Sequence, residues 1–391
     1  MKILILTSCF GMGHYCAAEA IKEELIAKGS EDDIEIVDIV KVLFPFTYKI
    51  IYKVFNNFIC RFSFIYNWVN SFATDHEEGC VKKRALNKIE RLLKSQNPDL
   101  IIATWSAAAR YVSDYKKQYE CKTPLYTYIT DVTVHEGWIT EKSDMYFVGA
   151  ESTKKVLLSA GVDESKIVID GIPVRQAFKQ ETKLELNGEK KNLLDKKEIL
   201  IMGGGLGLIP DLDKLLKELS NTSTLHITVL TGKNKKLLKK LNKNYPEIEA
   251  VGYTNKVNEY MERADLLITK PGGISTFEAI YAKAPLYVIK PFFSQELGNA
   301  EFIEKMNIGK IVWNDEVDIC KDIISVVNDT EGIKNMKYNM GKLAMEVRES
   351  KLKSIYERNV KINVGYNPID SYYSIFNDIW HNPYISLQRA K

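Results

Sequence analysis

A glycine-rich segment near the start of the chain has the residue types of a phosphate-binding or proton-transfer site. Gly11, Gly13 and His14 follow an apolar run at residues 2–7 and open a stretch with helical spacing. Glycines let the backbone approach a ligand closely, and a helix N-terminus favours an anion. A histidine there can exchange protons near neutral pH. Cys16 replaces the third small residue of a nicotinamide-binding GxGxxG loop, although Asp38, at the end of the second strand, leaves that interpretation open.

A second glycine cluster begins the other half of the chain. Gly203, Gly204, Gly205 and Gly207 follow an apolar strand-like run at residues 199–202. Four glycines in five residues exceed the need of a tight turn, so we expect a cradle of backbone N–H groups for an anion. The Gly-Lys-Ser/Thr of a Walker loop does not follow.

Two acidic residues lie just beyond this cluster. Asp211 and Asp213 resemble a metal-binding pair, but they occupy positions typical of helix N-caps. We favour capping over metal binding there.

A third motif joins a strand to a helix through Gly272 and Gly273. The free N–H groups of such a turn point out of the carboxyl edge of a sheet, where phosphates bind. Ser275 or Thr276 could add a hydroxyl. We place Glu278 in the first helical turn, where its carboxylate could hold the two hydroxyls of a ribose or simply cap the helix.

A fourth segment follows the next strand and is rich in hydrogen-bonding side chains. Gln295, Glu296 and Asn299 offer the donors and acceptors that sugar hydroxyls need. The segment is weak evidence alone, but its position after the three glycine motifs points to a bound sugar.

The elements that position these residues alternate between strands and helices. Helical spacing is clearest at residues 17–28 and 81–94. Such alternation predicts parallel sheets covered by helices, and it restarts after a polar stretch at residues 180–197. We therefore expect an α/β protein of two Rossmann-like domains. The predicted strands are residues 2–7, 34–40, 100–104, 125–130, 145–148, 199–202, 226–231, 266–269, 286–289 and 310–313.

Composition narrows the functional classes. The chain has 391 residues, with 54 Lys and Arg against 51 Asp and Glu, a net charge of +3 that argues against nucleic acid as a partner. The six cysteines show no paired spacing typical of disulfides or zinc ligands. We see no membrane span and no signal peptide, and we expect a cytoplasmic protein.

An aromatic and basic segment interrupts the alternation at residues 42–73. It carries Lys49, Lys53 and Arg61 and no acidic residue, and residues 41–94 hold ten basic against four acidic side chains. It is either a helical hairpin packed on its own domain or an element that contacts an anionic membrane surface. A second aromatic stretch, residues 366–391, is expected to pack back on the body.

The four motifs, in this order and spacing, resemble glycosyltransferase family 28, most closely its diacylglycerol branch. The specific segments are GMGHYCAAEAI and TKPGGISTFEAI, supported by GGGLG, by GIPVR, and by ITDVTVHEGW with Asp131, His135 and Trp138. The resemblance covers roughly residues 1–360 and implies a GT-B fold, whose two domains face each other across a cleft. The expected domains are residues 1–177 and 198–362, followed by a tail at 363–391.

The resemblance also implies an inverting transfer from a UDP-hexose, with neither a metal nor another cofactor. Gly203, Gly204, Gly205, Gly272 and Gly273 would cradle the diphosphate. Glu278 would hold the ribose, and Val251, Gly252 and Tyr253 would meet the uracil. Gln295, Glu296 and Asn299 would contact the donor sugar. His14, Asp131 and His135 would handle the acceptor hydroxyl beside the Gly11–Gly13 loop, and either His14 or Asp131 could be the base.

The expected acceptor is a membrane lipid, 1,2-diacylglycerol, with the protein peripheral at the cytoplasmic face through residues 42–73. Phe293-Ser294 stands where the family commonly has Pro-Gly, so the donor remains open between glucose, galactose and N-acetylglucosamine. Alternatives are a polyprenyl-linked acceptor, a UDP-sugar epimerase and a non-catalytic nucleotide-sugar sensor.

Overall fold

Short apolar runs form the strands and amphipathic segments form the helices in both halves of the chain. The structure, a computed structural model, describes residues 1–58, 80–180, 196–207, 209, 211–289, 294–314 and 316–363. The chain divides into two compact units, Met1–Glu349 and Ser350–Lys391. Both sheets belong to the first unit, and helix α16 (Leu352–Asn363) belongs to the second.

The N-terminal sheet is entirely parallel, with strand order β2-β1-β3-β4-β5-β6. Leu4, Leu6 and Ile101 are fully buried in it, as continuous apolar strands covered on both faces require. The strand predicted to reach residue 40 ends at Asp38, because the Asp38 side chain caps the next helix. The strands are β1 (Lys2–Thr7), β2 (Asp33–Asp38), β3 (Leu100–Ala103), β4 (Leu125–Tyr128), β5 (Met145–Val148) and β6 (Ile167–Ile169).

The C-terminal sheet repeats this architecture with strand order β12-β11-β10-β7-β8-β9. All its pairs are parallel, and Ile201, Leu267 and Tyr287 are fully buried. The strands are β7 (Lys197–Met202), β8 (Leu225–Leu230), β9 (Glu249–Val251), β10 (Leu266–Thr269), β11 (Leu286–Val288) and β12 (Gly309–Ile311).

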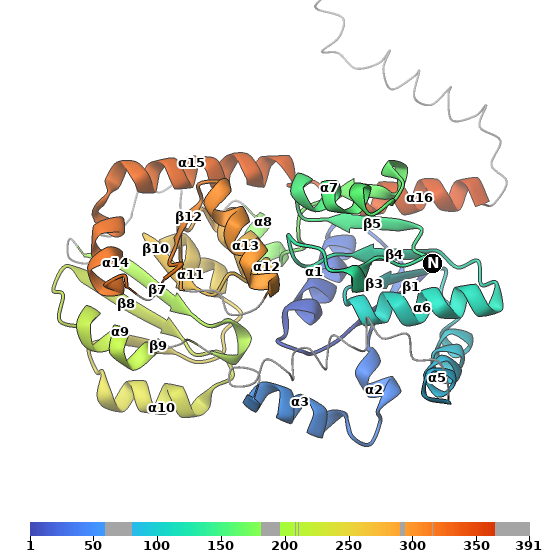
Figure 1. Ribbon diagram of the computed structural model, residues 1–391, viewed down its shortest axis with the longest axis horizontal. Coiled ribbons are helices and arrows are strands. Elements are labelled where there is room, and N and C mark those ends of the chain that lie inside the picture. The colour runs from blue at the N-terminus through green and yellow to red at the C-terminus, as the bar shows by residue number, and fades with distance from the viewer. Residues whose placement is uncertain are drawn as a thin grey trace, which may run out of the picture. The chain divides into compact units, whose positions relative to one another are not determined.

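Helices cover both sheets, and three of them, α1, α8 and α12, pack against one another between the sheets (Figure 1). The N-terminal half contains α1 (Gly13–Ala27), α2 (Ile39–Leu43), α3 (Tyr48–Phe58), α5 (Cys80–Gln96), α6 (Ser106–Tyr119), η1 (Glu136–Trp138), α7 (Glu151–Ser159), η2 (Glu164–Lys166) and α8 (Gln176–Lys179). The C-terminal half contains η4 (Gly204–Leu206), α9 (Leu212–Leu219), α10 (Lys235–Asn244), α11 (Val257–Arg263), α12 (Gly273–Ala282), α13 (Ser294–Lys305), α14 (Ile319–Asn328) and α15 (Thr330–Glu346).

The strand orders locate the expected binding sites. Each sheet reverses its winding direction at one point, between β1 and β3 in the first and between β7 and β10 in the second. Ligands of open α/β sheets bind at the carboxyl ends of the strands at these switch points. The glycine motifs after β1, β7 and β10 occupy those positions.

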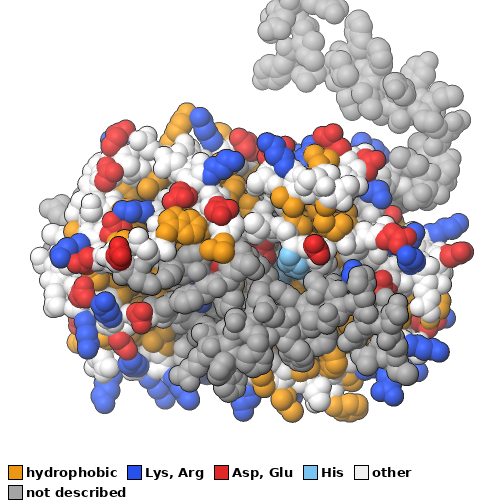
Figure 2. Space-filling view, in the orientation of Figure 1, with side chains coloured by type: hydrophobic (Ala, Val, Ile, Leu, Met, Phe, Trp, Pro, Cys, Tyr) orange, Lys and Arg blue, Asp and Glu red, His pale blue; other side chains and the backbone are white. Residues whose placement is uncertain are grey.

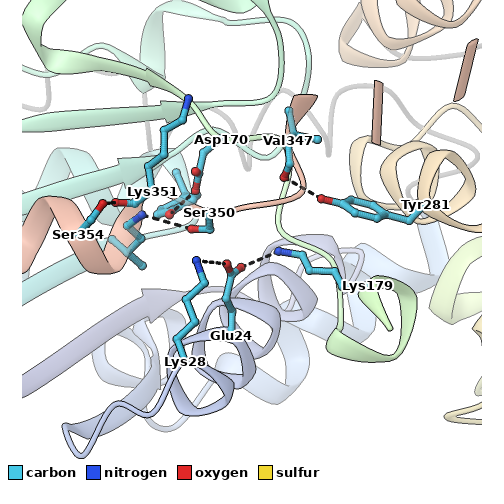
Figure 3. A network of polar contacts seen from close by, with 11 residues as sticks. Glu24, Lys28, Asp170, Lys179, Tyr281, Val347, Ser350, Lys351 and Ser354 are labelled. Atoms are coloured by element: carbon cyan, nitrogen blue, oxygen red, sulfur yellow. Dashed lines mark hydrogen bonds and ion pairs between the residues drawn. The ribbon is translucent and has the colours of Figure 1, made fainter. Parts of the chain in front are cut away.

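Short helix α8 ties the end of the N-terminal half to α1. Lys179 Nζ lies 2.8 Å from Glu24 Oε2, and Lys28 also pairs with Glu24 (Figure 3). On the C-terminal side, Tyr281 donates a hydrogen bond of 2.8 Å to the carbonyl of Val347 (Figure 3). The polar stretch at 181–195 and the tail from 364 lie outside the described residues. The domain limits 1–177 and 198–362 and the tail at 363–391 stay predictions.

None of the helices in the described part of the chain combines the length and the apolar character needed to cross a membrane. Cys9, Cys16, Cys121 and Cys320 are free thiols.

Candidate functional site

The loop between β1 and α1 turns sharply through two residues with left-handed backbone. Gly11 has a φ of +63° and Met12 a φ of 70°. Helix α1 begins at Gly13, and its N-cap residue Met12 makes no side-chain capping bond. N–H groups of the first turn are therefore placed to bind an anion.

The glycine loop after β7 faces the loop after β1. A Cβ atom at Gly205 would lie 3.5 Å from the Cβ of Met12, so the two loops nearly touch. Gly207 has a φ of +61°, and a Cβ there would lie 2.3 Å from the Thr231 carbonyl oxygen. Thus the fold requires glycine at 207 for close backbone packing, and the same packing holds the loop at the point where the halves meet.

Lys233 lies beside both loops, and sequence reasoning missed it. Its backbone N–H donates to the Gly205 carbonyl at 3.1 Å, and its Nζ lies 4.0 Å from Met12 Sδ. The ammonium also lies 5.6 Å from the ring centroid of Tyr253. The available signal was a cation directly after Gly232, at the carboxyl end of the strand next to β7.

The motif after β10 provides a second helix N-terminus. Gly272 is the N-cap of α12 and makes no side-chain capping bond. A Cβ on Gly273 would lie 2.1 Å from the carbonyl oxygen of Thr130, so this helix end abuts the loop that follows β4. Thr276 donates its hydroxyl to the Gly272 carbonyl at 2.9 Å, and Ser275 is half-buried.

Glu278 lies deeper in α12 than predicted. Its placement in the first helical turn was wrong, because α12 begins at Gly273 and has no acidic residue in that turn. The side chain is buried and does not act as a cap: Arg175 Nε and Nη2 donate to its Oε1 at 2.9 and 2.6 Å. Burial raises the pKa of Glu278, and the Arg175 guanidinium offsets part of that rise. Arg175 is the last residue of the GIPVR segment. Its role could not be inferred from the sequence, because its partner Glu278 is 103 residues away.

Two histidines of the N-terminal half lie around Trp138. The ring centroids of His14 and His135 are 6.2 and 6.0 Å from that of Trp138. His14 Nδ1 is 2.9 Å from the Thr130 hydroxyl, whereas His135 Nδ1 accepts from the Gly137 N–H at 3.2 Å. Burial lowers the pKa of His14 to about 4 and also lowers that of His135. Both rings are therefore neutral at pH 7.

Asp131 lies where the loop after β4 meets the C-terminal half. Its Oδ1 accepts from Asn299 Nδ2 at 3.1 Å, and the backbone N–H of Gly273 also bonds its carboxylate. Burial raises the pKa of Asp131 to about 6, helped by the charge of Glu296 and opposed by these two donors. Such a carboxylate is mostly ionised at pH 7 but retains appreciable basicity.

The remaining predicted residues have different environments. Glu296 is half-buried on α13, and the side chain of Gln295 lies outside the described part of the chain. Gly252 packs against Leu238, and Tyr253 is 72% exposed. Asn299 is buried, with its amide bonded to protein groups. Contacts of all these residues with a donor stay predictions.

Two other hypotheses concerned acidic residues: a metal site or a helix cap at Asp211 and Asp213, and a nicotinamide ribose at Asp38. Asp213 pairs with Lys240, and Asp211 makes no side-chain capping bond, so the cap expected there does not form. Asp38 is buried and accepts through Oδ1 from the Val40 N–H and the Tyr52 hydroxyl at 3.0 and 2.7 Å, and its Oδ2 is also shielded from solvent, which argues against a nicotinamide ribose at this carboxylate.

Comparison with known proteins identifies the family to which the two halves of the chain are similar. Residues 14–174 match the monogalactosyldiacylglycerol (MGDG) synthase family, and residues 199–358 match the glycosyltransferase family 28 C-terminal domain. A processive diacylglycerol beta-glucosyltransferase from Bacillus pumilus is 30% identical over 356 residues, covering 88% of this chain and 91% of the relative.

Solved structures share the fold at low sequence identity. MurG from Acinetobacter baumannii aligns with a TM-score of 0.54 and 14% identity, covering 89% of this chain and 95% of that chain. UDP-GlcNAc 2-epimerase from Neisseria meningitidis aligns with a TM-score of 0.55 and 15% identity, covering 92% of this chain and all of that chain, 100%.

Two parallel α/β sheets with glycine loops meeting at their switch points define the GT-B fold, and the family and full-length matches identify the chain as a glycosyltransferase. Within that class, the full-length similarity is specific. The chain belongs to the diacylglycerol glycosyltransferase branch of glycosyltransferase family 28.

Proposed function

We propose that this protein transfers a hexose from a UDP-sugar to 1,2-diacylglycerol, with inversion at the anomeric carbon. One observation carries the proposal: Asp131, from the N-terminal half, lies against the N-terminus of α12 in the C-terminal half. An inverting displacement needs a base on one side of the sugar and a stabilised leaving group on the other. The relatives named processive diacylglycerol beta-glucosyltransferases support diacylglycerol as acceptor and favour glucose as the hexose.

The donor would lie on the C-terminal half. We expect the departing diphosphate to be stabilised by the α12 N-terminus, by the amides of the glycine loops and by Lys233, in place of a metal ion. Both bonds from Arg175 end on Oε1 of Glu278, so we expect Oε2 to take the ribose hydroxyls. The proposed donor residues are Gly203, Gly204, Gly205, Gly252, Tyr253, Gly272, Gly273, Ser275, Gln295 and Glu296.

Asp131 is the better candidate for the base that accepts the proton of the acceptor hydroxyl. A general base works best when its pKa is near the operating pH, and Asp131, with a pKa of about 6, meets this condition better than His14, with a pKa of about 4. We assign His14 to orienting the acceptor through its ring, which is held at Nδ1 by Thr130. His135 would complete the acceptor side, next to the Gly11–Gly13 loop.

The acceptor requires contact with a membrane, and α3 fits that task. Ile50 and Val54, one turn apart on α3, are 62 and 40% exposed, and Phe46, in the turn just before the helix, is 96% exposed; we call these three residues the apolar stripe. Exposed Lys49 and Lys53 flank it. Figure 2 shows hydrophobic side chains at the lower edge of the molecule, where α3 lies in Figure 1.

The opposite side of α3 is anchored to the β1–α1 loop. The Tyr52 hydroxyl accepts from the Cys9 N–H at 3.0 Å, and Phe55 packs on Phe10. We therefore propose that the exposed stripe rests on the cytoplasmic face of the membrane. The predicted membrane segment continues through residues 59–73, which lie outside the described residues.

A transfer assay tests the proposed function. Purified protein is incubated with vesicles that contain diacylglycerol, and UDP-glucose, UDP-galactose and UDP-N-acetylglucosamine are supplied separately. Mass spectrometry is expected to detect a glycosyl-diacylglycerol with one of the three donors, and we expect that donor to be UDP-glucose. The Asp131→Asn variant is expected to form no product. Binding of UDP without any glycolipid product would contradict the proposal, and conversion of the donor to an isomeric UDP-sugar would indicate an epimerase.

A further inference from the structure

Asn299 connects the two halves of the molecule at the level of Asp131. It lies on α13, is 1% exposed and uses both ends of its amide. Its Oδ1 accepts from the backbone N–H of Val132 at 2.8 Å. Its Nδ2 donates to Asp131 Oδ1 at 3.1 Å and to the Pro271 carbonyl at 2.9 Å. One side chain thus bonds the loop after β4 and the turn before α12.

The surroundings keep this amide in place. Next to it, Gly298 faces Thr133 so closely that a Cβ at 298 would lie 1.7 Å from Thr133 Cγ2. Val132, whose N–H bonds Asn299, is fixed from its other side by Thr153, which donates to its carbonyl at 2.7 Å. An amide held at three points by backbone and carboxylate has its orientation determined by those partners.

We propose that Asn299 is a positioning residue that orients the Asp131 carboxylate for the acceptor hydroxyl when the two halves are in contact. This inference rests on the proposed function, because it assumes that Asp131 is the base. It differs from the sugar contact predicted for Asn299, since the amide is directed at the base and the backbone of both halves.

Electrostatics give this arrangement a measurable signature. Asp131 faces Glu296 on α13, the N-terminus of α12 at Gly273 and, through neighbouring Thr130, the neutral ring of His14 on α1. Glu296 and burial favour the protonated carboxyl, whereas Asn299 and Gly273 favour the carboxylate. Both favourable donors come from the C-terminal half, so loss of Asn299 removes one of two hydrogen bonds to the charged form.

The experiment measures the titration of Asp131 in the full-length protein, independently of turnover. Aspartate is labelled with ¹³C at the side-chain carboxyl, and the Asp131 signal is identified by its loss in Asp131→Asn. In Asn299→Ala the Asp131 pKa is expected to rise by roughly one unit, the effect of losing one hydrogen bond to a charged group. The acidic limb of the transfer rate against pH is expected to move upward by the same amount.

Two further variants complete the test. Asn299→Asp keeps the size of the side chain but places a second carboxylate beside Asp131, so a larger upward shift is expected. Asn258→Ala is the matched control: it removes another buried amide of the C-terminal half, one that donates to the Ala177 carbonyl at 3.4 Å, and should leave Asp131 unchanged.

Two results would overturn the inference. One is an Asp131 pKa in Asn299→Ala equal to that of the unmodified protein. The other is a raised KM for the donor with an unmoved acidic limb, which would indicate a sugar contact. If the unmodified protein makes no glycolipid, the proposed function fails, and the titration still decides whether Asn299 positions Asp131.

Discussion

Gly273 of α12 and Thr130 of the loop after β4 are in backbone contact across the two halves of the molecule. A Cβ atom at position 273 would lie 2.1 Å from the Thr130 carbonyl oxygen, whereas one at position 272 would meet no heavy atom within 4 Å. Neither glycine has a positive φ. The two adjacent glycines therefore serve different purposes: one permits close packing, and the other leaves a helix end open.

This difference predicts unequal responses to the same substitution. Gly273→Ala should destabilise the protein by about 2 kcal/mol or more, because backbone on both sides must shift to admit the methyl group. Gly272→Ala should change stability by less than about 1 kcal/mol. Urea unfolding of both variants checks the prediction, and equal losses would contradict the packing argument.

Asp131→Asn should stabilise the protein while abolishing transfer. The folded-state pKa of Asp131, about 6, exceeds its ordinary value of 3.8, so between these two pH values the folded state binds more protons than the unfolded one. Stability therefore falls as the pH rises through this window and stays lower above it. Since Asp131 is partly exposed, we expect a gain on the order of 1 kcal/mol at pH 7.5 and none near pH 3.5.

Thermal unfolding of Asp131→Asn and of the unmodified protein between pH 3.5 and 8 measures this linkage. In parallel, the transfer rate of the unmodified protein should rise with pH through about 6 and then level off, because only the carboxylate accepts a proton. A rate limb near pH 4 instead would favour His14 as the base.

Lys233→Ala should weaken UDP binding roughly threefold to tenfold, because an exposed cation beside the glycine loops contributes modest, screened attraction to a diphosphate. Lys235→Ala is the control, since Lys235 is an exposed cation two residues further on. Calorimetry at low and high salt measures both variants, and the effect of Lys233→Ala should shrink with salt. Equal weakening by both substitutions would show that only the overall charge matters.

The apolar stripe of Phe46, Ile50 and Val54 should govern membrane binding. Replacing Phe46, Ile50 and Val54 by serine is expected to abolish co-sedimentation with anionic vesicles, since apolar burial is lost. Replacing Lys49 and Lys53 by glutamate should remove the preference for anionic over neutral vesicles. Met345→Ser, at an apolar residue 77% exposed on α15, serves as control. Binding by the serine variant equal to that of the unmodified protein would locate the contact elsewhere.

Most strands could be predicted from their apolar runs, including β11 and β12 with three residues each, whereas β6 and β9 could not. β1 and β10 match their predicted limits, because continuous burial demands continuous apolar residues. The two missed strands also have three residues each, and in β9 (Glu249–Val251) one of the three is acidic. Glycine spacing also located the loops after β1, β7 and β10, because tight turns and close backbone contacts favour glycine at particular positions.

Contacts between residues far apart in the sequence could not be predicted from local patterns. The pairing of Arg175 with Glu278 joins residues 103 apart, and the approach of Lys233 to Met12 joins residues 221 apart. Asn299 was expected to contact a sugar because its amide offers a donor and an acceptor for hydroxyls, and its bonds to Asp131, Val132 and Pro271 could not be foreseen. Its burial follows from the meeting of two domains, which no local pattern encodes.

The contact between Gly298 and Thr133 has a consequence for how such a protein can be recombined. The methyl group of Thr133 occupies the space that a side chain at 298 would need. The two halves are therefore fitted to each other rather than interchangeable modules. A chimera that joins this C-terminal half to an N-terminal half from another enzyme keeps the space beside Gly298. That space stays unfilled unless the position equivalent to 133 is threonine. Exchange of donor-binding halves between such enzymes is thus constrained by steric pairs as well as by chemistry.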